Sequence, residues 1–152
     1  MKYLVDSGYE AHFEPPSETF NFGEIWINLT GEIILKVFIK TEQIPTETSL
    51  VQGSPLHFVH FFIALDHQVE KSLFSDAARY VALLNKVIPI GAFGFSEADR
   101  AFVFKYAFPT KEVDPTQLDV IISLIHYAID LYAPTLKNFN GIDSFLSQSQ
   151  LD

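Results

Sequence analysis

The chain has 152 residues, a length typical of one domain that buries a hydrophobic core without disulfides or metal ions. It contains no cysteine, which excludes a thiol nucleophile, a disulfide framework and any cysteine-ligated metal centre. The formal net charge of -9 opposes binding to polyphosphate. We therefore expect neither nucleic acid nor an anionic membrane surface as a partner.

The first residues, MKYLVDSGYE, lack the apolar run that precedes a signal-peptide cleavage site. No stretch of the sequence reaches the roughly 18 uninterrupted apolar residues of a membrane-spanning helix. We therefore expect a cytoplasmic protein without a membrane partner. The 15 phenylalanines predict an aromatic core between a sheet and helices, and part of this aromatic surface can also belong to an interface.

Residues 1–22 show a weak alternation of apolar side chains, as at Tyr9 and Phe13, before Pro15-Pro16 interrupts regular structure. We interpret them as an irregular or edge segment. Mostly apolar, β-branched or aromatic residues then predict two strands, near 24–29 and 32–41.

The loop from Thr41 to Pro55 is rich in proline, glycine and polar residues, and its length makes it a candidate functional or mobile loop. The next segment, Leu56 to Leu65, is dense in strand-forming residues without a clean alternation. This pattern predicts a central strand that is covered on both faces.

The second half of the chain predicts a helix, two strands and a second helix. Apolar residues recur at spacings of three and four between 75 and 88, and Pro89 ends that helix. Aromatic residues alternate in 93–95 and 102–108, which predicts an antiparallel pair of strands. The sequence Asp114-Pro115-Thr116-Gln117 predicts the start of a long helix, with a side-chain acceptor at the N-cap and proline at the first helical position.

We expect Ala133-Pro134 to stop the long helix. The prediction for the whole chain is a single α+β domain over residues 1–152. It has an antiparallel sheet of about five strands and two main helices packed on one face, in the order ββ-β-α-ββ-α. An irregular N-terminal segment (1–22) and a polar C-terminal tail (137–152) flank it.

The histidines and carboxylates do not form a recognisable site. His57 and His60 are three residues apart, so on a strand they project to opposite faces and cannot share one metal ion. Asp66-His67 with Glu70 has the composition of an acid–base cluster, but also that of an ordinary polar turn. The sequence has no phosphate-binding glycine motif and no G-x-S-x-G motif. We predict no catalytic, cofactor-binding or metal-binding residue, and no cofactor.

Four segments, taken in their order along the chain, resemble the type III secretion chaperone-like superfamily, and more specifically YbjN-type proteins and their cyanobacterial relatives of unknown function. These segments are Leu83-Leu84-Asn85, Gly91-Ala92-Phe93-Gly94-Phe95, Phe102 to Tyr106, and Tyr132-Ala133-Pro134-Thr135-Leu136. The resemblance implies a sheet of about five strands with helices against one face, commonly in a homodimer. In secretion chaperones that surface holds an extended or helical client segment, without ATP and without catalysis. Residues 1–22 depart from the family pattern, because they lack its long amphipathic first helix.

Two functional hypotheses follow. The first is a non-catalytic protein-binding module that holds a partner segment, or a second copy of itself, on an apolar surface. Its candidate interface residues are Phe102, Phe104 and Tyr106, whose side chains face either the core or a partner. The second is a small-molecule binder or enzyme with a pocket near His57, His60 and Asp66, beneath the 41–55 loop.

Overall fold

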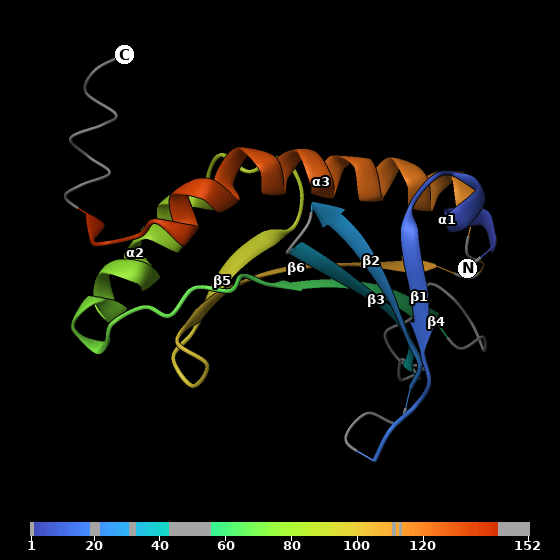
Figure 1. Cartoon of the computed structure of the whole chain (residues 1–152), viewed down its shortest axis with the longest axis horizontal. Helices are drawn as coiled ribbons and strands as arrows, with labels where there is room; N and C mark the ends of the chain where they lie inside the picture. The colour runs from blue at the N-terminus through green and yellow to red at the C-terminus, as the bar shows by residue number, and fades with distance from the viewer. Residues whose placement is uncertain are drawn as a thin grey trace, which may run out of the picture. The chain divides into compact units, whose positions relative to one another are not determined.

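The computed structural model describes residues 2–18, 22–30, 33–42, 56–110, 112 and 114–142. The chain is an α+β protein whose six strands form one antiparallel sheet in the order β1-β2-β3-β4-β6-β5 (Figure 1). The elements are α1 (Lys2–Asp6), β1 (Glu10–Glu14), β2 (Glu24–Thr30), β3 (Ile33–Glu42), β4 (Leu56–Ala64), the short 3-10 helix η1 (Lys71–Leu73), α2 (Phe74–Leu84), β5 (Ala92–Ser96), β6 (Ala101–Thr110) and α3 (Pro115–Lys137).

The predicted α+β class and the ββ-β-α-ββ-α order are confirmed from β2 to α3. The sheet gains its sixth strand from residues 1–22. We interpreted that segment as irregular or edge: the edge alternative is confirmed by the edge strand β1, whereas the irregular one needs correction, because the segment also contains α1. A five-residue helix is too short to show a hydrophobic period in the sequence. Leu4, which is buried, fixes α1 through tertiary packing.

The chain divides into two compact units. Unit 1 comprises Met1–Phe62 and Tyr106–Ser123, and unit 2 comprises Ile63–Lys105 and Leu124–Asp152. Three elements, β4, β6 and α3, contribute residues to both units.

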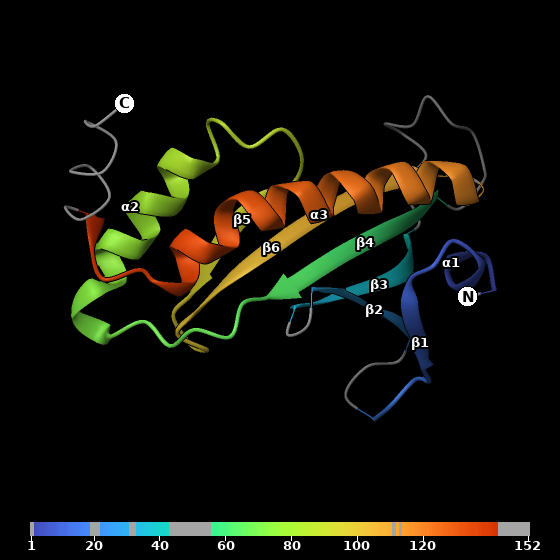
Figure 2. The same ribbon diagram turned by 45° about the horizontal axis from the view of Figure 1, so that its top comes forward.

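In unit 1, the strands β1, β2, β3 and β4 lie side by side (Figure 2). Ile25 pairs with Val37, and Val37 pairs with Phe61, so these three side chains share one face of the sheet. The opposite face carries Trp26 and Phe38. Successive strand residues therefore alternate between a packed apolar face and a face with mixed polar and aromatic side chains.

In unit 2, aromatic rings connect β5 and β6 with the helical segments. Phe93 contacts Phe104 at 5.4 Å between ring centroids and Tyr132 of α3 at 6.2 Å. Phe102 contacts Phe139 at 5.4 Å. The predicted aromatic core is therefore present in this unit.

The helix α2 ends at Leu84, four residues earlier than the prediction from Pro89. We attribute the early end to Asn85, the residue that follows the helix, because its side chain forms two hydrogen bonds with the backbone of β5. Its amide nitrogen donates to the carbonyl oxygen of Phe93 at 2.9 Å, and its amide oxygen accepts from the Phe93 N–H at 2.9 Å. These two hydrogen bonds fix the C-terminus of α2 against the strand.

The predicted start of α3 is confirmed, since the Thr116 N–H donates to Asp114 Oδ1 at 2.9 Å. The predicted end is wrong, because α3 continues through Pro134 to Lys137. Leu136 is fully buried, and the backbone N–H of Asn138 donates to the carbonyl oxygen of Pro134. Burial of this last turn outweighs the hydrogen bond that the proline cannot donate.

The segment that we expected to be a polar tail begins inside α3 at Lys137. Phe139 and Ile142 are both buried, so residues 138–142 belong to the core of unit 2. Residues 143–152 lie outside the described residues, as do residues 43–55 of the predicted functional loop.

Candidate functional site

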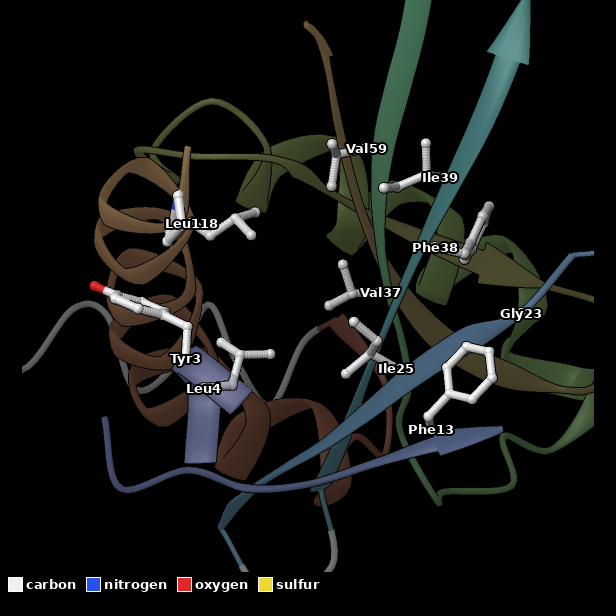
Figure 3. A pocket seen from close by; sticks show the side chains of 11 residues that line it. Tyr3, Leu4, Phe13, Gly23, Ile25, Val37, Phe38, Ile39, Val59 and Leu118 are labelled. Atoms are coloured by element: carbon white, nitrogen blue, oxygen red, sulfur yellow. The ribbon is translucent and has the colours of Figure 1, made fainter. Parts of the chain in front are cut away.

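Unit 1 contains an apolar pocket with a volume of about 470 Å³ (Figure 3). Its lining combines residues of the packed face of the sheet, together with Phe38 of the opposite face and Gly23 before β2, with residues from α1 and the start of α3. The lining residues are Tyr3, Leu4, Phe13, Gly23, Ile25, Val37, Phe38, Ile39, Val59, Pro115 and Leu118. The volume lies within the range of about 300–1,000 Å³ that is typical of small-ligand pockets.

The base of the pocket is fixed by strand register. Ile25 pairs with Val37 across β2 and β3, and Ile39 pairs with Val59 across β3 and β4. Figure 3 shows the side chains of Leu4 and Leu118 across the cavity from Val37. The pocket is therefore closed on one side by sheet residues and on the other by helical residues.

The rim of the pocket exposes apolar side chains to solvent. Tyr3, Phe13 and Ile39 are between 39% and 53% exposed. The ring of Phe13 lies directly against the backbone at Gly23, where an added Cβ atom would come within 2.5 Å of it. Glycine at this position thus permits the close contact that keeps Phe13 at the wall of the pocket.

Side-chain hydrogen bonds from Tyr9 link the residue before β1 to Asp119 and Ser123 of α3 in unit 1. The residue Tyr9, just before β1, donates its hydroxyl hydrogen to Asp119 Oδ1 at 2.9 Å. The pKa of Tyr9 is raised, chiefly because burial disfavours the charged phenolate; the hydrogen bond with Ser123 opposes the shift and the nearby Asp119 carboxylate adds to it. The neutral phenol is therefore the form that the folded protein favours.

We expect Tyr9→Phe to lower the free energy of unfolding by about 1 kcal/mol at neutral pH, because it removes this hydrogen bond. The raised pKa predicts that the contribution of Tyr9 stays constant below its ordinary pKa near 10 and is lost as the pH rises through the higher folded-state value. Urea unfolding from pH 7 to 11 should show a smaller alkaline loss of stability in the variant. An identical alkaline loss in both proteins would contradict this assignment.

The pocket has no lining side chain that is acidic or basic. Within the described parts of the chain, no group of three or more metal-binding side chains comes together. The site can therefore bind an apolar group by burial, and the phenol of Tyr3 is the polar side-chain group among its described lining residues.

The structure places two of the three predicted interface residues in the core. Phe102 and Phe104 are 0% exposed within unit 2, so neither side chain is available to a partner of the folded chain. Tyr106, in unit 1, is partly exposed, and its ring contacts those of Phe61 and Phe108. It does not line the pocket. The regular alternation of β6 showed that these residues share a face, but it did not show which face is buried.

The residues of the second predicted site, His57, His60 and Asp66, do not meet in the pocket. His57 pairs with Thr41 and His60 with Phe38, three residues apart on β4, so their side chains project to opposite faces. The His60 ring stacks on Phe38 at 4.9 Å, and Asp66 lies in the segment that follows β4, in unit 2. None of His57, His60 and Asp66 lines the pocket in unit 1.

The helix α3 carries a second apolar surface that the sequence interpretation missed. We call it the outer stripe, and it consists of Val120, Leu124, Tyr127 and Leu131, which are between 43% and 61% exposed. Another face of the same helix, which includes Ile121, Ile125 and Ile129, is buried. The signal was present in the sequence, because the outer stripe also recurs at spacings of four and three.

No helix in the described ranges is both long enough and apolar enough to cross a membrane. No protein-family model, no curated protein and no solved structure matches the chain.

Proposed function

We propose that the protein is a non-catalytic protein-binding module that holds an apolar segment of a partner protein in the pocket of unit 1. The observation that carries the proposal is the pocket itself, which has a volume of about 470 Å³ and, among the described residues, no carboxylate, imidazole, amine or guanidinium group in its lining. Its exposed rim extends the apolar surface beyond the cavity. A polypeptide segment fits this arrangement, because one anchoring side chain fills the cavity while its neighbours cover the rim.

The net charge of the chain indicates what the partner segment contains. Glu10 and Glu14 of β1 lie on the face of the sheet opposite Phe13, away from the pocket, so the expectation rests on the net charge of -9. We expect an apolar anchor with basic residues on either side of it, since opposite charges accelerate association and favour the correct partner. The resemblance to secretion-chaperone-like proteins supports an extended or helical partner segment.

Two variants on one strand test this proposal. Ile39 lines the pocket and is 47% exposed, whereas Ile34 is 40% exposed on the opposite face of β3 and does not line it. Ile39→Gln should weaken partner binding at least tenfold, because it places an amide in the apolar rim, and Ile34→Gln should leave binding unchanged. Both residues are already partly exposed, so neither change should prevent folding.

The measurement is affinity capture from the source cell at moderate salt, with quantitative mass spectrometry of proteins retained by the wild type and by each variant. The proposal requires a near-stoichiometric partner that Ile39→Gln loses and Ile34→Gln keeps. Equal retention by both variants would show that the partner binds elsewhere.

A small apolar ligand is the second candidate, and the deep base of the pocket favours it. Val37, Val59 and Leu4 are almost completely buried, as in pockets that exclude water. Native mass spectrometry of the purified protein distinguishes the two candidates. An added mass that Ile39→Gln reduces would indicate a retained small molecule, and an unmodified mass with a pocket-dependent protein partner would support the first proposal.

A further inference from the structure

The segment 138–142, which follows α3, returns the chain to the core of unit 2. Phe139 is 7% exposed, and its ring contacts that of Phe102 at 5.4 Å between centroids. Ile142 is 3% exposed, and its backbone N–H donates to Asp76 Oδ2 of α2 at 3.4 Å. Tertiary contacts therefore hold the chain on both sides of the two residues between them.

Those two residues are Asn140-Gly141, a pair with a reaction of its own. Asn140 is exposed, and the residue after it has no Cβ atom to shield its backbone nitrogen. In such a pair the Gly141 nitrogen, once it has lost its proton, attacks Cγ of Asn140 and expels ammonia, which closes a succinimide ring. Water then opens the ring to give aspartate, or isoaspartate, in which the main chain runs through the side-chain carboxyl. The net reaction consumes one water and releases one ammonia, without an enzyme or an oxidant.

The fold requires glycine at position 141. Its φ angle is +124°, which residues with a Cβ atom rarely adopt. An added Cβ would have ordinary contacts, at 3.6 Å from Asp76 Oδ2 and 3.7 Å from Leu73 Cδ2, so the requirement comes from the backbone rather than from a lack of space. The conformation that brings Ile142 to Asp76 therefore depends on the same glycine that makes the pair reactive.

The other asparagines are internal controls. The chain has five asparagines, and only Asn140 precedes a glycine. In the described ranges, three others donate hydrogen bonds from their side-chain amides: Asn28 to Glu10 Oε2 at 3.0 Å, Asn85 to the Phe93 carbonyl oxygen at 2.9 Å, and Asn138 to the Pro134 carbonyl oxygen at 2.8 Å. The residues that follow these three, Leu29, Lys86 and Phe139, have large side chains that hinder attack by their backbone nitrogens.

We infer that Asn140 is a site of spontaneous deamidation, and that its conversion to isoaspartate releases the segment 138–142 from unit 2. Isoaspartate adds one carbon atom to the main chain between Phe139 and Ile142, and these two residues cannot then both keep their positions in a close-packed core. The new carboxylate also lies one residue before the glycine that contacts Asp76, so it adds a like charge there. None of these residues lines the pocket of unit 1.

Peptide mapping by mass spectrometry tests the chemical step. The full chain is incubated in its native state at pH 6.5 and at pH 8.5, and the acidic product is quantified at every asparagine. Asn140 should convert at least tenfold faster than Asn138 in the same segment, and its rate should rise with pH, because the Gly141 nitrogen must lose its proton before it attacks. Asn140→Gln should leave position 140 unconverted over the same period, because the longer side chain closes its ring far more slowly. Equal rates at Asn140 and Asn138 would overturn the assignment of the site.

Amide hydrogen exchange of the incubated protein tests the release. After quenching and digestion, the peptides with asparagine, aspartate and isoaspartate at position 140 are separated, so exchange at Ile142 is measured for each form. It should be at least tenfold faster in the isoaspartate form than in the unconverted protein, because the bond to Asp76 and the burial that protect this amide are lost. Unchanged exchange in the isoaspartate form would overturn the release. Ile39→Gln should deamidate at the wild-type rate, so failure of the pocket proposal and failure of this inference give different results.

Discussion

Replacing Gly91 by alanine should lower the free energy of unfolding by about 3 kcal/mol. Gly91 has a φ angle of +69°, in the left-handed region that disfavours residues with a Cβ atom. An added Cβ would also lie 2.3 Å from Phe104 Cζ and 2.9 Å from the carbonyl oxygen of Lys105. The ring of Phe104 is fully buried, so it cannot move away without opening the core of unit 2.

Gly8 provides a control that separates backbone strain from the steric clash. Its φ angle is +91°, but no heavy atom lies within 4 Å of an added Cβ. Gly8→Ala should therefore cost only about 1–2 kcal/mol, from backbone strain alone. Urea-induced unfolding followed by circular dichroism measures both variants. An equal loss in the two proteins would show that the contact with Phe104 has no energetic consequence.

Truncating Phe102 to alanine should destabilise the protein by about 3–5 kcal/mol, the usual cost of removing a buried aromatic ring. Phe102 is 0% exposed, and its ring contacts Phe95 at 5.5 Å and Phe139 at 5.4 Å between centroids. The loss combines the transfer of the ring to water with the cavity that it leaves. This effect is large relative to the stability of most domains, so the variant should unfold at a much lower urea concentration.

The matched control for Phe102 is an aromatic ring on the surface. Tyr127→Ala removes a side chain that is 61% exposed, and it should change the stability of the monomer by less than about 0.5 kcal/mol. Both variants are measured at low protein concentration, so that association does not contribute. A loss below about 1 kcal/mol for Phe102→Ala would contradict its core position and return it to the candidate interface residues.

The order of the elements from β2 to α3 was predictable because its signals are local. The N-cap of α3 depends on residues within one turn, and the structure has the predicted bond from the Thr116 N–H to Asp114. The alternation of Phe102, Phe104 and Tyr106 likewise depends only on the strand period of two. Such patterns are independent of what packs against them, so a single sequence displays them.

Burial, by contrast, depends on residues that are distant in the sequence. The alternation of β6 does not reveal that Phe102 meets Phe139, and the sequence near Pro134 does not reveal that burial of Leu136 extends α3 by a further turn. The pocket is a similar case, because Leu4, Val37 and Leu118 meet only after three separate segments have folded together.

The sequence by itself therefore determined the composition of the chain, which has no thiol and a net charge of -9. It also determined the local elements, among them the aromatic strands and the capped final helix. The position of the candidate site was fixed by packing. The hydrophobic effect has no preferred direction, so the sequence does not show which face of a strand is buried. Whether Phe13 or Phe102 faces water depends on which other side chains cover it.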